Sequence, residues 1–422
     1  MTSFTVPGRP AGGLRTDAPL RVPGDKSISH RALLLAARAD GISTITGLSD
    51  GEDVGRTRDA VSALGAHVAS EGEGKVRVTG GRLHEPAGTV DAGNSGTTMR
   101  LLAGFCAPLP WRTVVAGDAS LSTRPMDRVV TPLRAMGARI DGRDGGRLAP
   151  LEIEGGALHG IDYELPVASA QVKGAVLLAG MGADGETVVR ERLRTRAHTE
   201  ELLALAGADI VVEDGGLVVR VRRSELRPID LHVQGDPSHA AFWLVAASIV
   251  PRSDVTLDDL YLGAGRDGFL RVLGRMGADV EVEGSSVRAR PAFLRASNIA
   301  GDEVPGLIDE LPVLAVAAAL ADGTSEFRDA AELRLKESDR IATMAEGLTR
   351  LGAEVEALPD GLLVHGPARL RGATVDAHGD HRVAMALAVA GLAAEGETTV
   401  EGWQAVAISY PTFAEDLRRC LS

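Results

Sequence analysis

The sequence predicts an α/β (α+β) fold of two domains, built from six βαβαββ repeats. A phrase of one apolar residue, Gly-Ala, any residue and Val or Ile occurs five times. Its glycines are 72, 70, 70 and 75 residues apart, at Gly65, Gly137, Gly207, Gly277 and Gly352. Apolar, alanine-rich runs also begin six times, 67 to 75 residues apart, at Asp25, Asn94, Ser169, Asp236, Asp309 and Asp380. Such regular spacing indicates one repeated supersecondary unit.

The elements follow the same order in each repeat. Each apolar run starts behind Asp, Asn or Ser, whose side chains accept hydrogen bonds from the free amides of a first helical turn. Most runs are apolar on all sides, so we predict buried helices. A short β-like stretch follows, such as GISTITG or WRTVVAG, and then a more amphipathic helix. That helix ends at the Gly-Ala phrase, where glycine permits the left-handed conformation of a helix end, and two strands complete the repeat.

Six repeats of about 70 residues are too many for one core, because domains usually hold about 100 to 200 residues. We therefore predict two domains of three repeats each. The sixth repeat lacks its hairpin, and we expect the N-terminal segment APLRVPG to supply the missing strand. On this prediction, residues 1–21 and 235–422 form one domain, and residues 22–234 form a second domain inserted into it.

Composition limits the classes of function. The 422 residues are 44% hydrophobic and 24% charged, which is typical of a globular protein. No apolar run reaches the roughly 18 uncharged residues of a membrane span. No signal peptide is visible and only two cysteines occur, so we expect a cytoplasmic protein without a disulfide framework. A net charge of −13 with 3% aromatic residues argues against nucleic acid as the main partner and leaves an anionic small molecule possible.

Lysine is scarce in this chain. Of 45 Lys and Arg residues only four are lysines, namely Lys26, Lys75, Lys173 and Lys336. A compact ammonium exchanges protons and points at one oxygen, which a guanidinium does not imitate. Lys26 and Lys336 are therefore the strongest functional candidates. For Lys173, two residues beyond Gln171, a side chain that reaches solvent is the simpler interpretation.

The helix N-termini are the expected location of the functional site. First-turn amides and the helix dipole attract anions. If the six buried helices point their N-termini toward the interdomain cleft, that cleft becomes electropositive in an acidic protein. The loops SLSTRPMDR and LRLKESDR add Arg124, Lys336, Glu337 and Arg340. Taken singly, each position is also explained by a capped helix with a solvated charge, and only the combined pattern favours a common site.

Six phrases together resemble one known family. GDKSISHRALLLAA, GNSGTTMRLL, ASAQVKGAVLLAG, IDELPVLAVAAA, LRLKESDR and DHRVAMA are similar, in this order, to signatures of the 5-enolpyruvylshikimate-3-phosphate (EPSP) synthases. The resemblance implies the enolpyruvyl transferase fold, with three repeats per domain. It also implies transfer of the enolpyruvyl group of phosphoenolpyruvate to the 5-hydroxyl of shikimate 3-phosphate, with release of phosphate. This reaction belongs to the shikimate pathway, needs no metal or organic cofactor, and is carried out by a monomer.

The resemblance also implies roles for individual residues. Asp309 is the base nearest the 5-hydroxyl, Glu337 donates and accepts a proton at the methylene carbon, and Lys26 assists proton transfer. The residues implied to bind shikimate 3-phosphate are Lys26, Ser27, Arg31, Ser169, Ala170, Gln171, Arg196, Asp309 and Lys336. Those implied to bind phosphoenolpyruvate are Lys26, Asn94, Gly96, Arg124, Gln171, Glu337, Arg340 and Arg382. Gly96 would let the backbone approach the ligand closely, although a plain turn glycine explains it equally well outside this phrase.

Two positions depart from family patterns, and a third leaves inhibitor sensitivity open. Ala197 stands where many members carry Asp, which removes a local carboxylate partner for Arg196. Ile408 precedes the Ser-Tyr-Pro sequence where some members have lysine, so one phosphate-side cation is absent or replaced. The arginine of the glycine phrase is followed by Leu101, and members carry Pro or Leu there, so the sequence does not decide sensitivity to glyphosate.

Other functions remain as alternatives. A UDP-N-acetylglucosamine 1-carboxyvinyltransferase shares the repeats and the reaction, but it usually carries a reactive cysteine at the position of Ala119 and lacks a DKSxSHR-like phrase. A non-catalytic anion-binding repeat protein, or a relative of the RNA-end cyclases, would have similar repeats. Neither explains the pair Asp309 and Glu337, nor the scarcity of lysine elsewhere.

Overall fold

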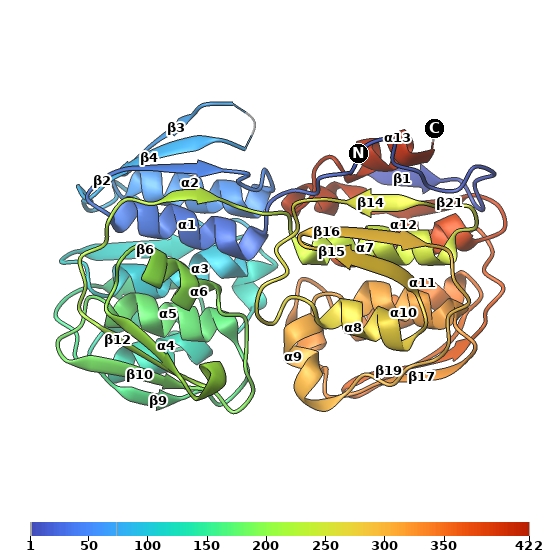
Figure 1. The fold of residues 1–422 in the computed structure, drawn as a ribbon. Helices are drawn as coiled ribbons and strands as arrows, with labels where there is room; N and C mark the ends of the chain where they lie inside the picture. The colour runs from blue at the N-terminus through green and yellow to red at the C-terminus, as the bar shows by residue number, and fades with distance from the viewer. Residues whose placement is uncertain (1, 73, 422) are drawn as a thin grey trace. The chain divides into compact units, whose positions relative to one another are not determined.

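The computed structural model describes residues 2–72 and 74–421. Its contacts divide the chain into two compact units (Figure 1). The first runs up to Pro23 and continues from Gln234, and we call it the terminal unit because it holds both chain ends. The second, Gly24–Val233, is the inserted unit.

The inserted unit contains three repeats and one closing strand. The first repeat consists of α1 (Lys26–Arg38), β2 (Gly41–Thr46), α2 (Glu52–Ala63), β3 (His67–Ser70) and β4 (Val76–Gly80). The second consists of β5 (Val90–Asp91), α3 (Gly96–Cys106), β6 (Arg112–Ala116), α4 (Asp127–Ala135), β7 (Arg139–Arg143) and β8 (Leu148–Glu154). The third consists of β9 (Asp162–Glu164), α5 (Ala170–Gly180), β10 (Glu186–Arg190), α6 (His198–Leu205), β11 (Ile210–Glu213) and β12 (Val218–Arg222), and β13 (Asp230–His232) ends the unit.

The terminal unit repeats this order. It starts with β1 (Ser3–Val6) and resumes with α7 (Pro237–Ile249), β14 (Val255–Leu257), α8 (Gly268–Arg275), β15 (Asp279–Glu283) and β16 (Ser286–Arg290). The next elements are α9 (Val304–Leu307), α10 (Leu311–Leu320), β17 (Gly323–Phe327), α11 (Arg340–Arg350), β18 (Glu354–Leu358) and β19 (Gly361–Gly366). The last are β20 (Thr374–Asp376), α12 (His381–Ala393), β21 (Thr398–Glu401) and α13 (Phe413–Leu421).

Each repeat forms its own small sheet, and the described residues contain six of them. In the second repeat β5 lies parallel to β6, β6 pairs antiparallel with β8, and β8 pairs antiparallel with β7. The third repeat has the same order, β9-β10-β12-β11. In the first sheet, β13-β2-β4-β3, the parallel strand is β13, which lies at the far end of the unit's sequence.

The N-terminal segment pairs differently from the prediction. The strand that joins the sheet of the sixth repeat is β1, with Ser3 opposite Glu401 of β21, so APLRVPG is not the strand that pairs there. Within that segment Leu20 instead forms an isolated parallel bridge with Leu257 of β14, in the fourth repeat. Leu20 and Val22 are both buried in the core of the terminal unit, which explains why this stretch lies beside β14.

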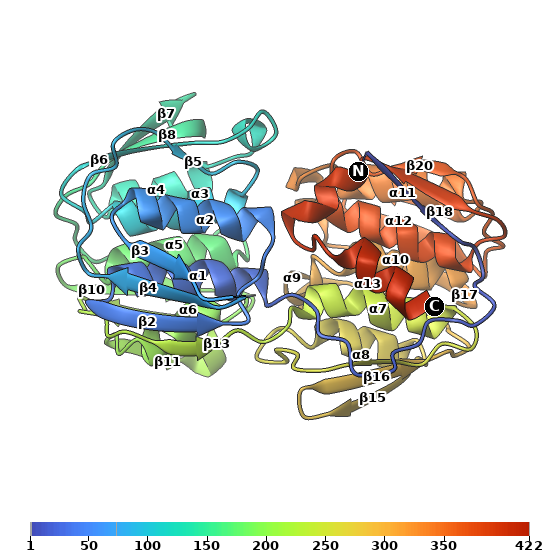
Figure 2. The same ribbon diagram turned by 90° about the horizontal axis from the view of Figure 1, so that it is seen from above.

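The apolar helices are buried, as predicted. Every residue of α3 and of α12 is buried. In both views the sheets lie outside these helices within each unit (Figures 1 and 2). The glycines of the five Gly-Ala phrases have φ angles between 81° and 107°, which confirms that they end the amphipathic helices in the left-handed region. No described helix has the length and apolar character needed to cross a bilayer.

Four of the six predicted helix starts are confirmed. Asp25, Ser169, Asp236 and Asp380 each accept a hydrogen bond from a first-turn amide. The prediction was wrong for the other two repeats. Ser95, not Asn94, caps α3. Helix α10 starts at Leu311 without any side-chain cap, so Asp309 lies before the helix and its carboxylate makes other contacts.

Candidate active site

Within the terminal unit, the N-termini of α7, α10 and α12 lie together. Ser238 of α7 donates to the carboxylate of Glu310, which directly precedes α10. Arg382, in the first turn of α12, donates through Nη1 to the backbone oxygen of Asp309 at 3.2 Å. The starts of these three helices therefore form one group of polar residues within the terminal unit.

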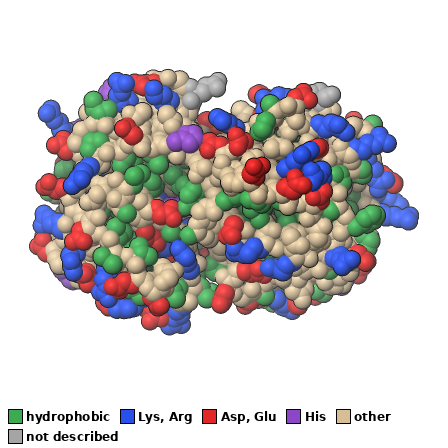
Figure 3. Space-filling model, in the orientation of Figure 1, with side chains coloured by type: hydrophobic (Ala, Val, Ile, Leu, Met, Phe, Trp, Pro, Cys, Tyr) green, Lys and Arg blue, Asp and Glu red, His purple; other side chains and the backbone are tan. Residues whose placement is uncertain are grey.

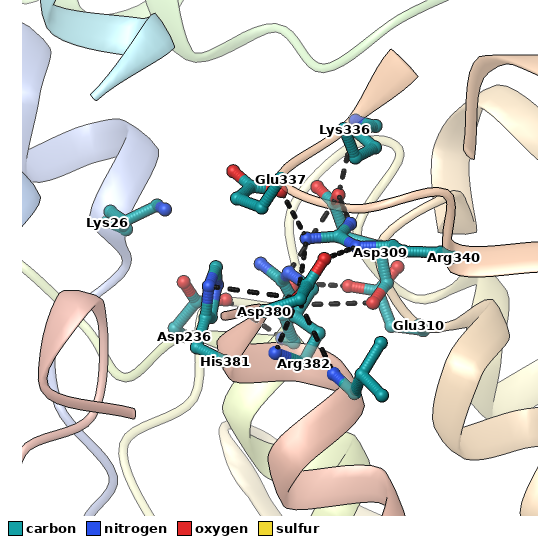
Figure 4. Close-up of polar contacts among 12 residues, drawn as sticks. Lys26, Asp236, Asp309, Glu310, Lys336, Glu337, Arg340, Asp380, His381 and Arg382 are labelled. Carbon is teal, nitrogen blue, oxygen red and sulfur yellow. Dashed lines mark hydrogen bonds and ion pairs between the residues drawn. The ribbon is translucent and has the colours of Figure 1, made fainter. Parts of the chain in front are cut away.

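The carboxylate of Asp309 is surrounded by cations (Figure 4). Its Oδ1 atom accepts from Lys336 Nζ at 3.3 Å and from Arg340 Nη1 at 3.2 Å, and Arg382 Nε lies 3.8 Å away. The chain between β17 and α11 supplies Lys336, α11 begins with Arg340, and α12 supplies Arg382. The structure thus brings together four of the residues that the sequence assigned to catalysis and to anion binding.

Arg340 connects the two carboxylates that we predicted to move protons. One of its terminal nitrogens contacts Asp309, and the other, Nη2, donates to Glu337 Oε2 at 2.6 Å. Its Nε donates to Asp380 Oδ2 at 2.7 Å. Burial alone would lower the pKa of the Arg340 guanidinium, but the charges of Asp380, Glu337 and Asp309 together raise it above the usual value. Arg340 is thus a permanent cation between the base and acid candidates.

Within the inserted unit, the N-termini of α1, α3 and α5 also lie together. Gln171, in the first turn of α5, donates through Nε2 to Thr97 Oγ1 of α3 at 2.9 Å. Arg31 of α1 donates through Nη2 to the backbone oxygen of Ala170 at 3.1 Å. Ser169 caps α5, and the backbone oxygen of Ser27 accepts from Arg31 Nη1 at 2.9 Å.

Lys26 is held by a carboxylate that the sequence did not reveal. Its Nζ atom lies 2.9 Å from Asp53 Oδ2, and both side chains are largely buried. Asp53 belongs to α2, and its backbone oxygen also accepts from Thr98 in α3 at 3.3 Å. This contact positions the Lys26 ammonium at the start of α1.

Arg124 and Gly96 lie at the start of α3. Arg124 Nη2 donates to Asn94 Oδ1, and the amide of Asn94 donates to Asp118 at 2.7 Å. A Cβ atom added to Gly96 would lie 3.1 Å from Arg100 Nη1 and 3.5 Å from Arg124 Nη1. Glycine at this position therefore leaves room for two guanidinium groups beside the backbone of the helix start.

Arg31 and Gln171 complete the group. Arg31 Nε donates to Thr199 Oγ1 of α6 at 2.6 Å. Burial lowers the pKa of Arg31 to about 10, although the nearby charges of Glu200 and Asp25 act in the opposite direction. Gln171 Oε1 accepts from Arg100 Nη1 at 2.6 Å. Arg196 lies in the loop just before α6, half-buried.

The chain is similar to known proteins over nearly its whole length. The profile of the EPSP synthase (3-phosphoshikimate 1-carboxyvinyltransferase) family matches residues 11–417. The chain belongs to the EPSP synthase family. A 3-phosphoshikimate 1-carboxyvinyltransferase of Synechococcus sp. (strain JA-3-3Ab) is 52% identical over 98% of this chain and 96% of the relative. One of Gloeobacter violaceus is 51% identical over 96% of each chain.

Solved structures agree with this membership. The EPSP synthase from Acinetobacter baumannii superposes with a TM-score of 0.86 at 38% identity, covering 100% of this chain and 98% of that one. The enolpyruvyl transferase NikO from Streptomyces tendae has a TM-score of 0.80 at 20% identity, covering 99% and 96%, and so shares the fold. The predicted enolpyruvyl transferase fold is confirmed.

Sequence reasoning missed several buried partners of the candidate site. Arg266 is fully buried and donates to Asp236, to Ser238 at 3.1 Å and to Glu310 at 3.4 Å. A signal for it exists in the repeats. The positions of Arg124, Arg196, Arg266 and Arg340 are 72, 70 and 74 residues apart, each within three residues of the start of an amphipathic helix. Lys173 was also misjudged, because its side chain is 1% exposed and does not reach solvent.

Proposed function

We propose that the clusters of both units serve one reaction, the transfer of the enolpyruvyl group of phosphoenolpyruvate to the 5-hydroxyl of shikimate 3-phosphate. This is the activity of the EPSP synthase family, to which the chain belongs. One observation supports the roles of Asp309 as base and Glu337 as acid. The guanidinium of Arg340 binds Asp309 through one terminal nitrogen and Glu337 through the other.

The acceptor, shikimate 3-phosphate, is anionic and carries hydroxyl groups. Arg31 and Arg196 supply guanidinium groups for its carboxylate and phosphate, because a planar fork suits both groups. The start of α5 adds the hydroxyl of Ser169, the backbone of Ala170 and the amide of Gln171. Ser27, Lys26 and, from the terminal unit, Lys336 and Asp309 complete the proposed acceptor set.

Phosphoenolpyruvate carries a phosphate and a carboxylate on a three-carbon unit. Arg124, Arg340 and Arg382 are the proposed guanidinium partners, joined by Lys26 and by the backbone at Gly96. Asn94, Gln171 and Glu337 complete the proposed set. Preorganised cations and amides stabilise the charge that accumulates between two phosphorylated reactants, and this is usually the largest single contribution to catalysis.

The proton transfers follow from the chemistry of addition and elimination. Asp309 removes the proton of the 5-hydroxyl while that oxygen bonds to C2 of phosphoenolpyruvate, and the methylene carbon takes a proton from Glu337. In the second step the bond from C2 to the phosphate oxygen breaks and phosphate leaves with a proton, while Asp309 gives up the proton that it took and Glu337 takes a proton back from the methyl group. Lys26 assists these transfers. One general acid and one general base are thereby accounted for.

The remaining parts of the proposal concern the whole molecule. The chain acts as a cytoplasmic monomer, and its terminal and inserted units are the two domains. Basic and acidic side chains are interspersed on the visible face of each unit (Figure 3). Sedimentation of the purified protein should give a single species of 43.9 kDa. A stable dimer at micromolar concentration would contradict the monomer.

The activity is tested by phosphate release. Purified protein should release phosphate when shikimate 3-phosphate and phosphoenolpyruvate are both present, and not with either alone. UDP-N-acetylglucosamine in place of shikimate 3-phosphate distinguishes the second enolpyruvyl transferase reaction. Equal release with that acceptor would refute the assignment, as would release that needs no acceptor.

A further inference from the structure

Lys173 forms a buried ion cluster that the proposed reaction does not use. It lies on α5, two residues beyond Gln171. Its ammonium is 2.8 Å from Glu191 Oε2 and 2.7 Å from Glu200 Oε1. The side chains of Lys173, Glu191 and Glu200 are between 1% and 4% exposed. One lysine and two glutamates are therefore enclosed together in the inserted unit.

Each partner of Lys173 belongs to a different segment. Glu191 comes directly after β10 and begins the loop of residues 191–197, which carries Arg196. Its carboxylate also accepts hydrogen bonds from the hydroxyl and, at 3.4 Å, from the amide of Thr195. The loop is thus folded around the same carboxylate that binds the ammonium, and Arg196 is the next residue.

The second carboxylate connects to Arg31. Glu200 lies in the first turn of α6, beside Thr199. The hydroxyl of Thr199 accepts from Arg31 Nε at 2.6 Å. The position of α6, which Glu200 fixes against α5, therefore decides where the guanidinium of Arg31 lies.

We propose that Lys173 is a positioning residue of the acceptor site, whose ammonium joins α5, the loop 191–197 and α6 into one arrangement. These are the segments that carry the proposed ligands of shikimate 3-phosphate in the inserted unit, so the inference rests on the proposed function. Without the ammonium, no ion pair would fix α5 to the loop 191–197 and to α6. The positions of Arg196 and of the Thr199–Arg31 contact relative to α5 would then be less well defined.

The residue types fit this role. An ammonium is compact and has three donors, so it serves carboxylates that approach from different segments, whereas a guanidinium offers a flat fork. The chain uses arginine for nearly every other cation. Replacing a buried ion pair by apolar residues of similar volume is often neutral or stabilising. Stability alone thus gives little reason for a buried lysine here, and geometric specificity gives a better one.

The cluster carries one surplus negative charge, and Arg31 lies close to it. A buried charge without a counterion costs several kcal/mol. Burial lowers the pKa of Arg31, and the charge of Glu200 opposes that change. The negative charge of the cluster therefore stabilises the Arg31 cation, and Arg31 offsets the surplus charge of the cluster. This interaction connects the ion cluster to the proposed acceptor site.

The test measures the dissociation constant of shikimate 3-phosphate by calorimetry, and KM and kcat by phosphate release. Lys173→Met keeps the length of the side chain and removes the ammonium. Lys173→Met leaves Glu191 and Glu200 without their shared lysine. A triple variant, Lys173→Met with Glu191→Gln and Glu200→Gln, therefore removes all three charges together. Asp416→Asn is the matched control, since Asp416 is a buried acceptor from Tyr410 and Thr412 in the terminal unit.

In both Lys173 variants the dissociation constant and KM for shikimate 3-phosphate should rise about tenfold or more, because small displacements of binding groups weaken their contacts. The change in kcat should be smaller, and Asp416→Asn should leave the dissociation constant unchanged. A triple variant that folds and binds shikimate 3-phosphate like the parent protein would overturn the inference.

A further variant separates this inference from the proposed function. Arg196→Ala removes a proposed ligand directly. If it leaves binding of shikimate 3-phosphate unchanged, the assignment of the acceptor site fails, and the inference fails with it. If Arg196→Ala weakens binding while the Lys173 variants do not, only the positioning role of Lys173 is refuted.

Discussion

Arg340 and Asp380 form an ion pair that is closed to solvent. Nε of Arg340 donates to Oδ2 of Asp380 at 2.7 Å, and Nη2 donates to Oδ1 at 3.3 Å. The same carboxylate caps α12 by accepting from the amide of Arg382 at 2.9 Å. One arginine thus ties the start of α12 to the carboxylates of Asp309 and Glu337, so fold and site depend on the same side chain.

Removing this arginine should destabilise the terminal unit. We expect Arg340→Met to lower the free energy of unfolding by about 3–5 kcal/mol, because a buried carboxylate is left without its counterion. Urea unfolding measures the change. Arg350→Met, at the exposed end of the same helix, should change stability by less than about 0.5 kcal/mol. Equal stability of the two variants would contradict the buried role of Arg340.

The role of Asp309 is tested by Asp309→Asn, which keeps the shape of the side chain. Loss of a general base should reduce kcat by about 100-fold or more. Calorimetry should still detect binding of shikimate 3-phosphate, because the cations around this position remain. The exposed Asp302→Asn in the same unit serves as the control. Near-normal turnover in Asp309→Asn would remove this residue from the mechanism.

The contact between α3 and α5 depends on a glycine. A Cβ atom on Gly104 of α3 would lie 2.0 Å from the backbone oxygen of Ala175 in α5. Alanine favours a helix by about 1 kcal/mol over glycine, but backbone atoms cannot yield to such an overlap. Gly104→Ala should therefore destabilise the inserted unit by about 1–3 kcal/mol.

Gly55→Ala is the matched control for this prediction. Gly55 lies inside α2, and no heavy atom from outside its own helix turn is found within 4 Å of an added Cβ. Here helix propensity acts without a clash, so stability should rise by about 0.5–1 kcal/mol. Thermal or urea unfolding that gave the two variants the same sign would contradict the close approach of α3 and α5.

His30 should make the inserted unit sensitive to acid. The imidazole is buried, with Nδ1 2.6 Å from Thr57 Oγ1. Burial, together with the charges of Lys26 and Arg31, holds its pKa well below the usual 6.5. As pH falls below 6.5, the unfolded chain binds a proton at His30 and the folded chain does not, so this contribution to stability is lost toward acid pH.

The variant His30→Asn isolates this effect. Between pH 7.5 and 5.5 the parent protein should lose about 1 kcal/mol more stability than the variant, whatever the variant's absolute stability. Urea unfolding at several pH values gives both slopes. His67→Asn, at an exposed position, should keep the slope of the parent. Parallel slopes for the parent and His30→Asn would show that the imidazole is not kept neutral.

Much of the fold was predictable because it repeats. The glycines of the Gly-Ala phrases and the caps Asp25, Ser169, Asp236 and Asp380 are local features, so the sequence shows them directly. Asn94 and Asp309 misled the prediction because a polar residue shortly before an apolar run resembles a cap. Their side chains instead contact arginine and lysine groups from distant segments, which outweigh the local preference.

The buried partners of the site were not predictable by the same reasoning. Asp53 binds Lys26 across 27 positions of the chain, and Glu200 lies equally far in sequence from Lys173. Each pair joins the two helices of one repeat, α1 with α2 and α5 with α6, and the spacing of the Gly-Ala phrase does not show which side chains of those helices meet. Lys173 illustrates the difficulty, because a lysine in an apolar helix is usually assigned to solvent until its two carboxylates are located.

The pairing of β1 with β21 affects how the protein folds during synthesis. Ser3–Val6 leaves the ribosome long before its partner Thr398–Glu401 is made. At roughly 5–20 residues per second, this strand waits about 20–80 s for its neighbour. The inserted unit, closed by β13 at residues 230–232, is complete long before that. Nascent chains should therefore acquire protease resistance in the inserted unit, Gly24–Val233, before they acquire it at Ser3–Val6.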